Sequence, residues 1–306
     1  MKVERVLVAT DFSAAGQRAV QTAADWARRE KAALRIVHVA PSARRLAGLW
    51  RTSTRDMHAV HRQAAAALGR LAEAIDPARQ LDLSTGLITG PAARQIARAA
   101  VEYQADLLVV GAHGEHETTT GQPGLGGTAT KLIGMTQVPL LLSRHAPTVP
   151  AKVLAAVDLS GVSSAVLEWA SRCAVGGELH VFHAYDVPFA SRLKAYGVAA
   201  GTLDVYTTDE NEKRDWQLTS LIASTCPGRD VHRIIERGDA ASLLLAHVQR
   251  LGPTVLVLGQ HSSRRGRQAS TQYGSVCRHA AFFSPTDVLI VPAIATASAS
   301  ARKVGS

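Results

Sequence analysis

Short apolar runs alternate with amphipathic stretches through the first half of the chain. Val3 to Ala9 is almost continuously apolar, which is typical of a central parallel strand covered on both faces. Similar runs predict four further strands, at residues 34–39, 81–88, 107–110 and 140–143. The stretches between them have helical spacing, and Gly90-Pro91 opens one of these helices with Pro near its first position. This alternation predicts a doubly wound α/β domain, a five-stranded parallel sheet with helices on both faces.

The same order of elements begins again after a short linker at residues 145–150. Asp11 in RVLVATDFS corresponds to Asp158 in KVLAAVDLS, an offset of 147 residues. Four more segments recur in order: LRIVHVA as ELHVFHA (178–184), GPAARQIARAA as GDAASLLLAHV (238–248), DLLVVG as TVLVLG (254–259), and GGTATKL as YGSVCRH (273–279). This period is far too long for a solenoid, so each copy is expected to be a complete domain. We predict two tandem domains, domain 1 at residues 1–145 and domain 2 at residues 151–293.

Residues 107–130, LLVVGAHGEHETTTGQPGLGGTAT, carry the most distinctive local pattern. A buried strand ends at Gly111, Gly114 follows, and Gly126-Gly127 precede a helix expected to start at Thr128. Glycines let the backbone turn sharply and approach a ligand closely, and the free N–H groups at a helix start favour an anion. The stretch therefore predicts a phosphate-binding loop, with an ordinary strand-to-helix turn as the alternative.

Composition and charge narrow the functional classes. The 306 residues are 46% hydrophobic, enough for two cores, and the formal net charge of +9 is spread over both halves. Because no basic patch is interleaved with aromatics that could stack on bases, we interpret this charge as a solvated surface and expect no tight nucleic-acid binding. Three widely spaced cysteines predict no disulfide framework and fit a cytoplasmic protein. No signal peptide is recognisable, and no apolar run has membrane-spanning length.

The sequence offers no clear catalytic or metal centre. It lacks GxSxG, the P-loop GxxxxGK[ST] and a Cys–His pairing of suitable spacing, which argues against a dedicated hydrolase. His113, Glu115, His116 and Glu117 have metal-binding side chains, but neighbouring loop residues rarely converge on one ion. We therefore predict neither catalytic residues nor metal ligands.

Both halves resemble the universal stress protein domain. The resemblance is carried by the strand ending in ATDFS, the His-Val pair ending the second strand, the segment ADLLVVGAHG, and the Gly-[Ser/Thr] pair at the last helix. It implies a tandem member of a family of ATP-binding stress-response or regulatory proteins, with ATP bound alone or together with Mg²⁺. A slow ATPase and a ligand-free scaffold for protein partners are the alternatives.

The family's nucleotide motif, G-x2-G-x9-G-[ST], assigns the implied site residue by residue. Asp11, beside Thr10, would contact the ribose, and the backbone of Val39 would contact adenine. The phosphates would lie against the glycine loop and the helix start, at Gly111, His113, Gly114, Gly127, Thr128, Ala129 and Thr130. Twelve residues rather than nine separate Gly114 from Gly127, which we interpret as a three-residue insertion.

The second copy departs further from this motif. Its weaker site would consist of Asp158, Gly259, Gly274 and Ser275. Ser262 stands where the second glycine belongs, and its Cβ would obstruct the approach of phosphates to the backbone. We therefore expect ATP binding mainly in domain 1.

The resemblance also predicts how the domains associate. The family commonly pairs domains through the edge strand near the C-terminus of each, here residues 140–143 and 288–291. Both strands are apolar and would be exposed edges if they were unpaired. We predict an intrachain pseudo-dimer joined by these strands. A further homodimer and a regulatory protein partner are left open.

Overall fold

The computed structural model describes residues 2–41, 54–113, 124–146, 151–186, 196, 200–260 and 274–293. Domain 1 contains β1 (Arg5–Ala9), α1 (Ala14–Glu30), β2 (Ala33–Ala40), α3 (Thr54–Ile75), β3 (Leu83–Thr89), α4 (Ala92–Glu102), β4 (Leu107–Gly111), α5 (Gly127–Met135) and β5 (Leu140–Ser143). Domain 2 contains β6 (Val153–Ala156), α6 (Ser163–Cys173), β7 (Leu179–Tyr185), α8 (Ala200–Thr225), β8 (His232–Arg237), α9 (Ala240–Leu251), β9 (Val255–Gln260), α10 (Ser275–Phe283) and β10 (Asp287–Pro292). The predicted alternation of strands and helices is confirmed in both halves.

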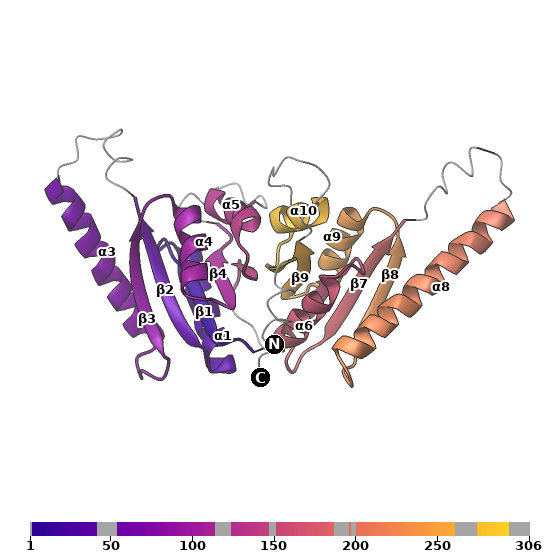
Figure 1. Cartoon of the computed structure of the whole chain (residues 1–306), viewed down its shortest axis with the longest axis horizontal. Coiled ribbons are helices and arrows are strands. Elements are labelled where there is room, and N and C mark those ends of the chain that lie inside the picture. The colour runs from indigo at the N-terminus through magenta and orange to yellow at the C-terminus, as the bar shows by residue number, and fades with distance from the viewer. Residues whose placement is uncertain are drawn as a thin grey trace.

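One continuous sheet runs through the molecule, in the order β3-β2-β1-β4-β5-β10-β9-β6-β7-β8. All strand pairs within each half are parallel, which confirms the predicted five-stranded parallel sheets. The halves meet where β5 and β10 pair in antiparallel fashion, with Leu141 opposite Leu289. These are the two strands predicted to join the domains, and the pairing relates the halves by an approximate twofold axis (Figure 1).

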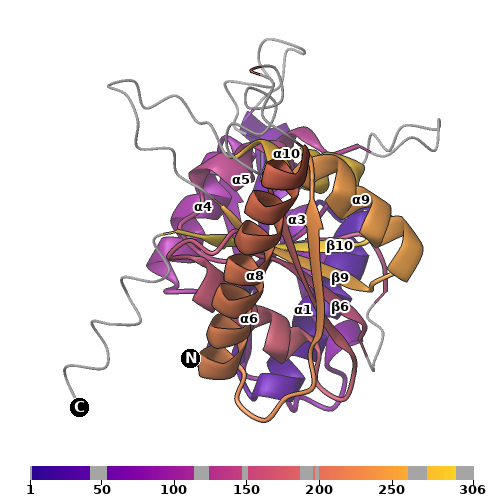
Figure 2. The same ribbon diagram turned by 90° about the vertical axis from the view of Figure 1, so that its right-hand side faces the viewer.

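Two helical layers cover the sheet, one on each face (Figures 1 and 2). Helices α1, α3, α6 and α8 bury their apolar sides on one face, and α4, α5, α9 and α10 cover the other. Successive strand residues alternate between the layers, so Leu141 packs into the first core while Leu140 and Leu142 pack into the second. Both cores continue across the junction of the domains. Burial of this shared apolar surface stabilises the association of the two halves.

Polar contacts at the junction are not symmetric. The buried carboxylate of Asp287 accepts hydrogen bonds from the backbone N–H groups of Arg144, at 2.7 Å, and His145, at 3.0 Å. Burial raises the pKa of Asp287, partly offset by these bonds. The Arg144 side chain donates to the carbonyl oxygens of Ala281 and Gly124, which ties β5 both to α10 and to the segment that leads into α5.

Helices α1 and α6 also contact each other across the junction of the domains. The rings of Trp26 and Trp169 lie 5.8 Å apart between centroids, and Arg172 donates to Glu30 at 2.9 Å. Trp169 is fully buried. The domains are therefore packed against each other on this face of the sheet as well as joined through their backbones.

The sheet register corrects one detail of the internal repeat. The sequence alignment of the two halves equates residues 34–40 with residues 178–184. In the sheet, however, Val6 pairs with Leu34, and its counterpart Val153 pairs with Leu179, so Leu34 is equivalent to Leu179. His38 is therefore equivalent to His183. Nδ1 of His38 donates to the Thr10 carbonyl at 2.8 Å, and Nδ1 of His183 makes the same bond to Val157 at 2.9 Å.

Candidate functional site

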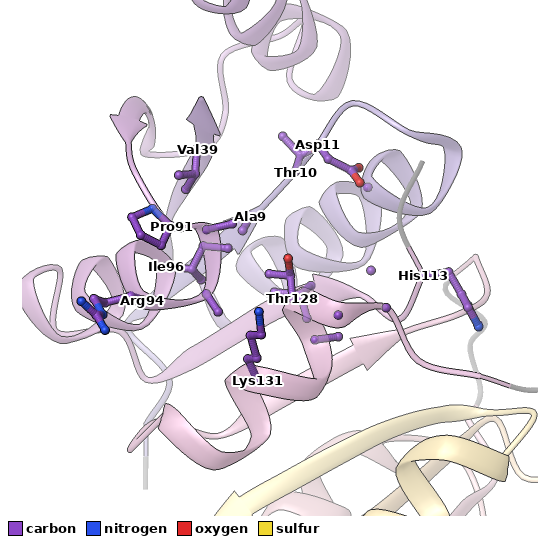
Figure 3. A pocket seen from close by; sticks show the side chains of 18 of the residues that line it. Ala9, Thr10, Asp11, Val39, Pro91, Arg94, Ile96, His113, Thr128 and Lys131 are labelled. Carbon is purple, nitrogen blue, oxygen red and sulfur yellow. The ribbon is translucent and has the colours of Figure 1, made fainter. Parts of the chain in front are cut away.

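A cavity of about 800 Å³ opens at the carboxyl ends of β1, β2 and β4. Ligands of open α/β sheets bind where successive crossovers leave for opposite faces. That point lies between β1 and β4, because α1 covers one face and α4 the other. Most residues predicted for the domain 1 site line this cavity: Thr10, Asp11, Val39, Gly111, His113, Gly127, Thr128 and Ala129 (Figure 3).

Asp11 lies in the turn between β1 and α1. Its Oδ1 accepts bonds from the backbone N–H of Ser13, at 3.1 Å, and from the Ser13 hydroxyl. Ser13 then caps α1 by accepting from Gly16 N. Between them Phe12 adopts φ 68°, a left-handed conformation that bulky residues rarely adopt. The carboxylate therefore shapes the turn and also faces the cavity (Figure 3).

Gly16 lets the first turn of α1 pass close to this carboxylate. A Cβ at Gly16 would lie 2.6 Å from Asp11 Oδ1 and 2.8 Å from Thr10 Oγ1, closer than real Cβ contacts. Glycine is thus needed here for close packing rather than for an unusual φ, and it lines the cavity itself.

The opposite side of the cavity is the start of α5. Gly126 is the N-cap, and its own N–H donates to the Ala112 carbonyl at 2.8 Å. The first helical bond runs from Thr130 N to Gly126 O, so the N–H groups of Gly127, Thr128 and Ala129 precede the hydrogen-bonded turns. These three donors and the positive end of the helix dipole give this edge of the cavity the chemistry that favours an anion.

Thr130 does not share this position. It is absent from the cavity lining, and its hydroxyl donates to the Gly126 carbonyl at 3.0 Å, alongside its backbone N–H. The donors expected from Thr130 are thus directed into the helix itself.

The remaining wall is mostly apolar. Val39 at the end of β2, Pro91 before α4, and Ile96 within α4 form this side together with Ala9 (Figure 3). Helix α4 begins without a side-chain cap because Pro91 occupies its N-cap position. The cavity therefore combines an apolar wall, one carboxylate and a helix start.

Some predicted features lie outside the described residues. Gly114 belongs to residues 114–123, as do Glu115, His116 and Glu117 of the histidine–glutamate cluster. Among the residues that are described, no group of three or more His, Cys, Asp or Glu side chains could hold a metal ion.

Comparisons with known proteins identify the family of the chain. A model of the universal stress protein family matches residues 2–144 and again residues 151–292. The chain belongs to the universal stress protein family. No curated protein matches it.

Solved structures share the fold of the whole chain. A universal stress protein from Archaeoglobus fulgidus DSM 4304 matches with a TM-score of 0.71 and 18% identity, covering 96% of this chain and 100% of its own. A functionally unknown protein from Pseudomonas aeruginosa PAO1 gives a TM-score of 0.68 at 20% identity and covers 98% of both chains. At such identities the likeness establishes the fold.

The second universal stress protein domain has a much smaller cavity at the equivalent place, about 180 Å³. The residues of the predicted weaker site all line it: Asp158, Gly259, Gly274 and Ser275. Ser262, which motivated the prediction of weak binding, lies outside the described residues.

Larger side chains account for the smaller volume. Val162 replaces Ala15 of domain 1, and its Cγ1 lies only 2.6 Å from where a Cβ on Gly259 would be. Phe182 lines this cavity, whereas its equivalent Val37 is not among the residues that line the domain 1 cavity. Ser163 replaces Gly16, and its hydroxyl donates to Asp158 Oδ1 at 3.1 Å. The carboxylate of domain 2 is therefore already engaged from the side that Gly16 leaves open in domain 1.

Several lining residues of domain 1 were missed by the sequence reasoning, notably Gly16, His38, Arg94 and Lys131. A signal was available for Lys131, which lies four residues after Gly127 and so on the same helical face. The sequence held no signal for Gly16, because its close packing against Asp11 depends on the distance between a helix and the end of a strand.

Proposed function

We propose that domain 1 binds one ATP per chain and that domain 2 binds it poorly or not at all. Ligand cavities usually have volumes of roughly 300–1,000 Å³. The domain 1 cavity, at about 800 Å³, is within this range, whereas the domain 2 cavity, at about 180 Å³, is below it. This difference between otherwise equivalent positions is the observation that carries the proposal.

The domain 1 lining suits the parts of the nucleotide in turn. Adenine would pack against the apolar wall at Val39 and Pro91, within reach of the backbone at the end of β2. The ribose hydroxyls would donate to Asp11, whose Oδ1 is fixed by Ser13. The phosphates would accept bonds from the N–H groups at the start of α5.

Magnesium fits this site only as a companion of the phosphates. Asp11 is the single carboxylate of the described lining, and the proposal assigns it to the ribose. Mg²⁺ is commonly held by phosphates and waters with few protein ligands. The ion would therefore enter on the nucleotide and supply charge neutralisation there.

Membership of the family supports a regulatory role in which nucleotide occupancy is read by a partner, in the cytoplasm. Turnover is a separate property, and phosphate release measured over hours in the same samples would separate a binding protein from a slow ATPase.

Isothermal titration with ATP tests the proposal, using Asp11→Ala and its equivalent Asp158→Ala as a matched pair. Asp11→Ala should cost about 1.5–3 kcal/mol, the range for a hydrogen bond to a charged group. Asp158→Ala should leave affinity and a stoichiometry of one unchanged. Loss of binding with Asp158→Ala alone would assign the site to the other domain, and no heat with the wild-type chain would reject ATP.

A further inference from the structure

Lys131 is a cation in the wall of the domain 1 cavity. It lies beyond the last position of the family's nucleotide motif, Thr128. It lies in the second turn of α5, and its side chain extends beside Thr128 towards the cavity (Figure 3). Helical side chains lean towards the N-terminus, so an amine four residues after Gly127 returns to the level of the first turn. Within the described residues Lys131 makes no ion pair, unlike Arg98 on α4, which binds Glu102 at 2.6 Å.

This placement is unfavourable in the absence of an anion. The beginning of a helix carries a partial positive charge, which repels cations and attracts anions. The described lining contains Arg94 and Lys131 but only one acidic residue, Asp11, on the opposite side of the cavity. Arg94 is also in the first turn of its helix, where the dipole disfavours it. Lys131 therefore adds a positive charge beside the three N–H groups at the start of α5, while Arg94 lies on α4 at another part of the lining (Figure 3).

The described lining of the domain 2 cavity contains no lysine or arginine. Ser242 replaces Arg94, and Asp239, which replaces Pro91, caps α9 by accepting from Ser242 N at 2.9 Å. Arg278 replaces Lys131 but does not line the small cavity. The charges of the described lining residues therefore favour an anionic ligand in domain 1 over domain 2, as the cavity volumes do.

Building on the proposed ATP site, we infer that Lys131 makes domain 1 selective for nucleotides that carry several phosphates. The ammonium group supplies a charge-assisted hydrogen bond to a phosphate oxygen beside the backbone donors. The attraction between Lys131 and the ligand grows with the charge of the ligand, so it favours ATP over ADP and ADP over AMP. An uncharged nucleoside gains nothing from it. Lys131 is thus a specificity-determining residue, and nucleoside triphosphates are the preferred class.

The test is titration of ATP, ADP, AMP and adenosine into the wild type, Lys131→Gln and Lys131→Arg. Because Lys131 is exposed, Lys131→Gln should weaken ATP binding by about twofold to fivefold. It should weaken AMP binding less and leave adenosine binding unchanged. Lys131→Arg should retain the preference, and in Lys131→Gln the affinity for ATP should fall less steeply with added salt.

Arg278→Gln, at the equivalent position of domain 2, is the matched control and should change none of these affinities. Equal weakening of ATP and adenosine, or an unchanged ratio of ATP to AMP affinity in Lys131→Gln, would overturn the inference. A wild-type chain that binds none of the four ligands would instead reject the proposed ATP site itself, so the two failures are distinguishable.

Discussion

Replacing Gly16 with alanine should separate the effect of this residue on stability from its effect on ligand binding. A Cβ at Gly16 lies 2.6 Å from Asp11 Oδ1, whereas ordinary contacts begin at 3.4 Å, so the carboxylate must move by about 0.8 Å. Binding groups need to be held within about 0.5 Å of the productive geometry. The expected loss of ATP affinity therefore approaches that of Asp11→Ala, about 1.5–3 kcal/mol or roughly tenfold to 150-fold.

Gly69→Ala provides the matched control for the same chemical change in a helix. Gly69 lies in α3, and a Cβ there meets nothing within 4 Å. Alanine should stabilise the protein by about 0.5–1 kcal/mol at this position, because glycine is the poorer helix former. At Gly16 the clash with Asp11 and Thr10 should cancel that gain.

Urea denaturation and isothermal titration of both variants measure the two quantities. Gly69→Ala should raise the free energy of unfolding and leave ATP binding unchanged, while Gly16→Ala should show no such gain and lose most of its affinity. Gly16→Ser would reproduce Ser163 of domain 2 and place a hydroxyl donor against the carboxylate. The reasoning is refuted if Gly16→Ala binds ATP within twofold of the wild type.

Three further predictions concern domain 2 and the junction. Val162→Ala combined with Phe182→Val should enlarge the small cavity at a cost of about 2–5 kcal/mol in unfolding free energy. In an Asp11→Ala background, titration should then detect weak ATP binding by domain 2, and its absence would show that volume is not what limits this domain. Asp287→Ala should lower the free energy of unfolding by about 1–3 kcal/mol, because it leaves the N–H groups of Arg144 and His145 unpaired, and an unchanged urea midpoint would contradict this. Since burial raises the pKa of Asp287 above 3.8, the folded state retains its proton at pH values where the unfolded chain has lost it. Stability should fall as pH rises through this window, and Asp287→Asn should remove that part of the slope.

The fold could be predicted because its signals are local and occur twice. Apolar runs such as Val6–Ala9 are buried on both faces, and the repeat of Asp11 as Asp158 fixed the order of elements in the second half. The pairing of β5 with β10 was expected from the family resemblance, and the need to cover two apolar edges supported it.

The details of the site depend on distances that the sequence does not contain. Thr130 fits the motif, yet its donors turn back to Gly126 because it completes the first helical bond. Weak binding by domain 2 was predicted from Ser262, which lies outside the described residues. Among the described residues, Val162 and Phe182 line the small cavity of this domain. Such residues fill a cavity from helices and strands far from the motif, so no reading of the motif alone could identify them.

The asymmetric contacts at the junction favour pairing of domain 1 with domain 2 over pairing of two copies of domain 1. Asp287 corresponds to Pro139 in domain 1, and Arg144 corresponds to Pro292 in domain 2. Two copies of domain 1 facing each other through β5 would put Pro139 in the place of Asp287, with no carboxylate to accept the N–H group of Arg144. Covalent linkage keeps the correct partner at high effective concentration whatever the amount of protein present. The second domain therefore covers the β5 edge of the first whether or not it holds a ligand, and the small volume of its own cavity does not affect that role.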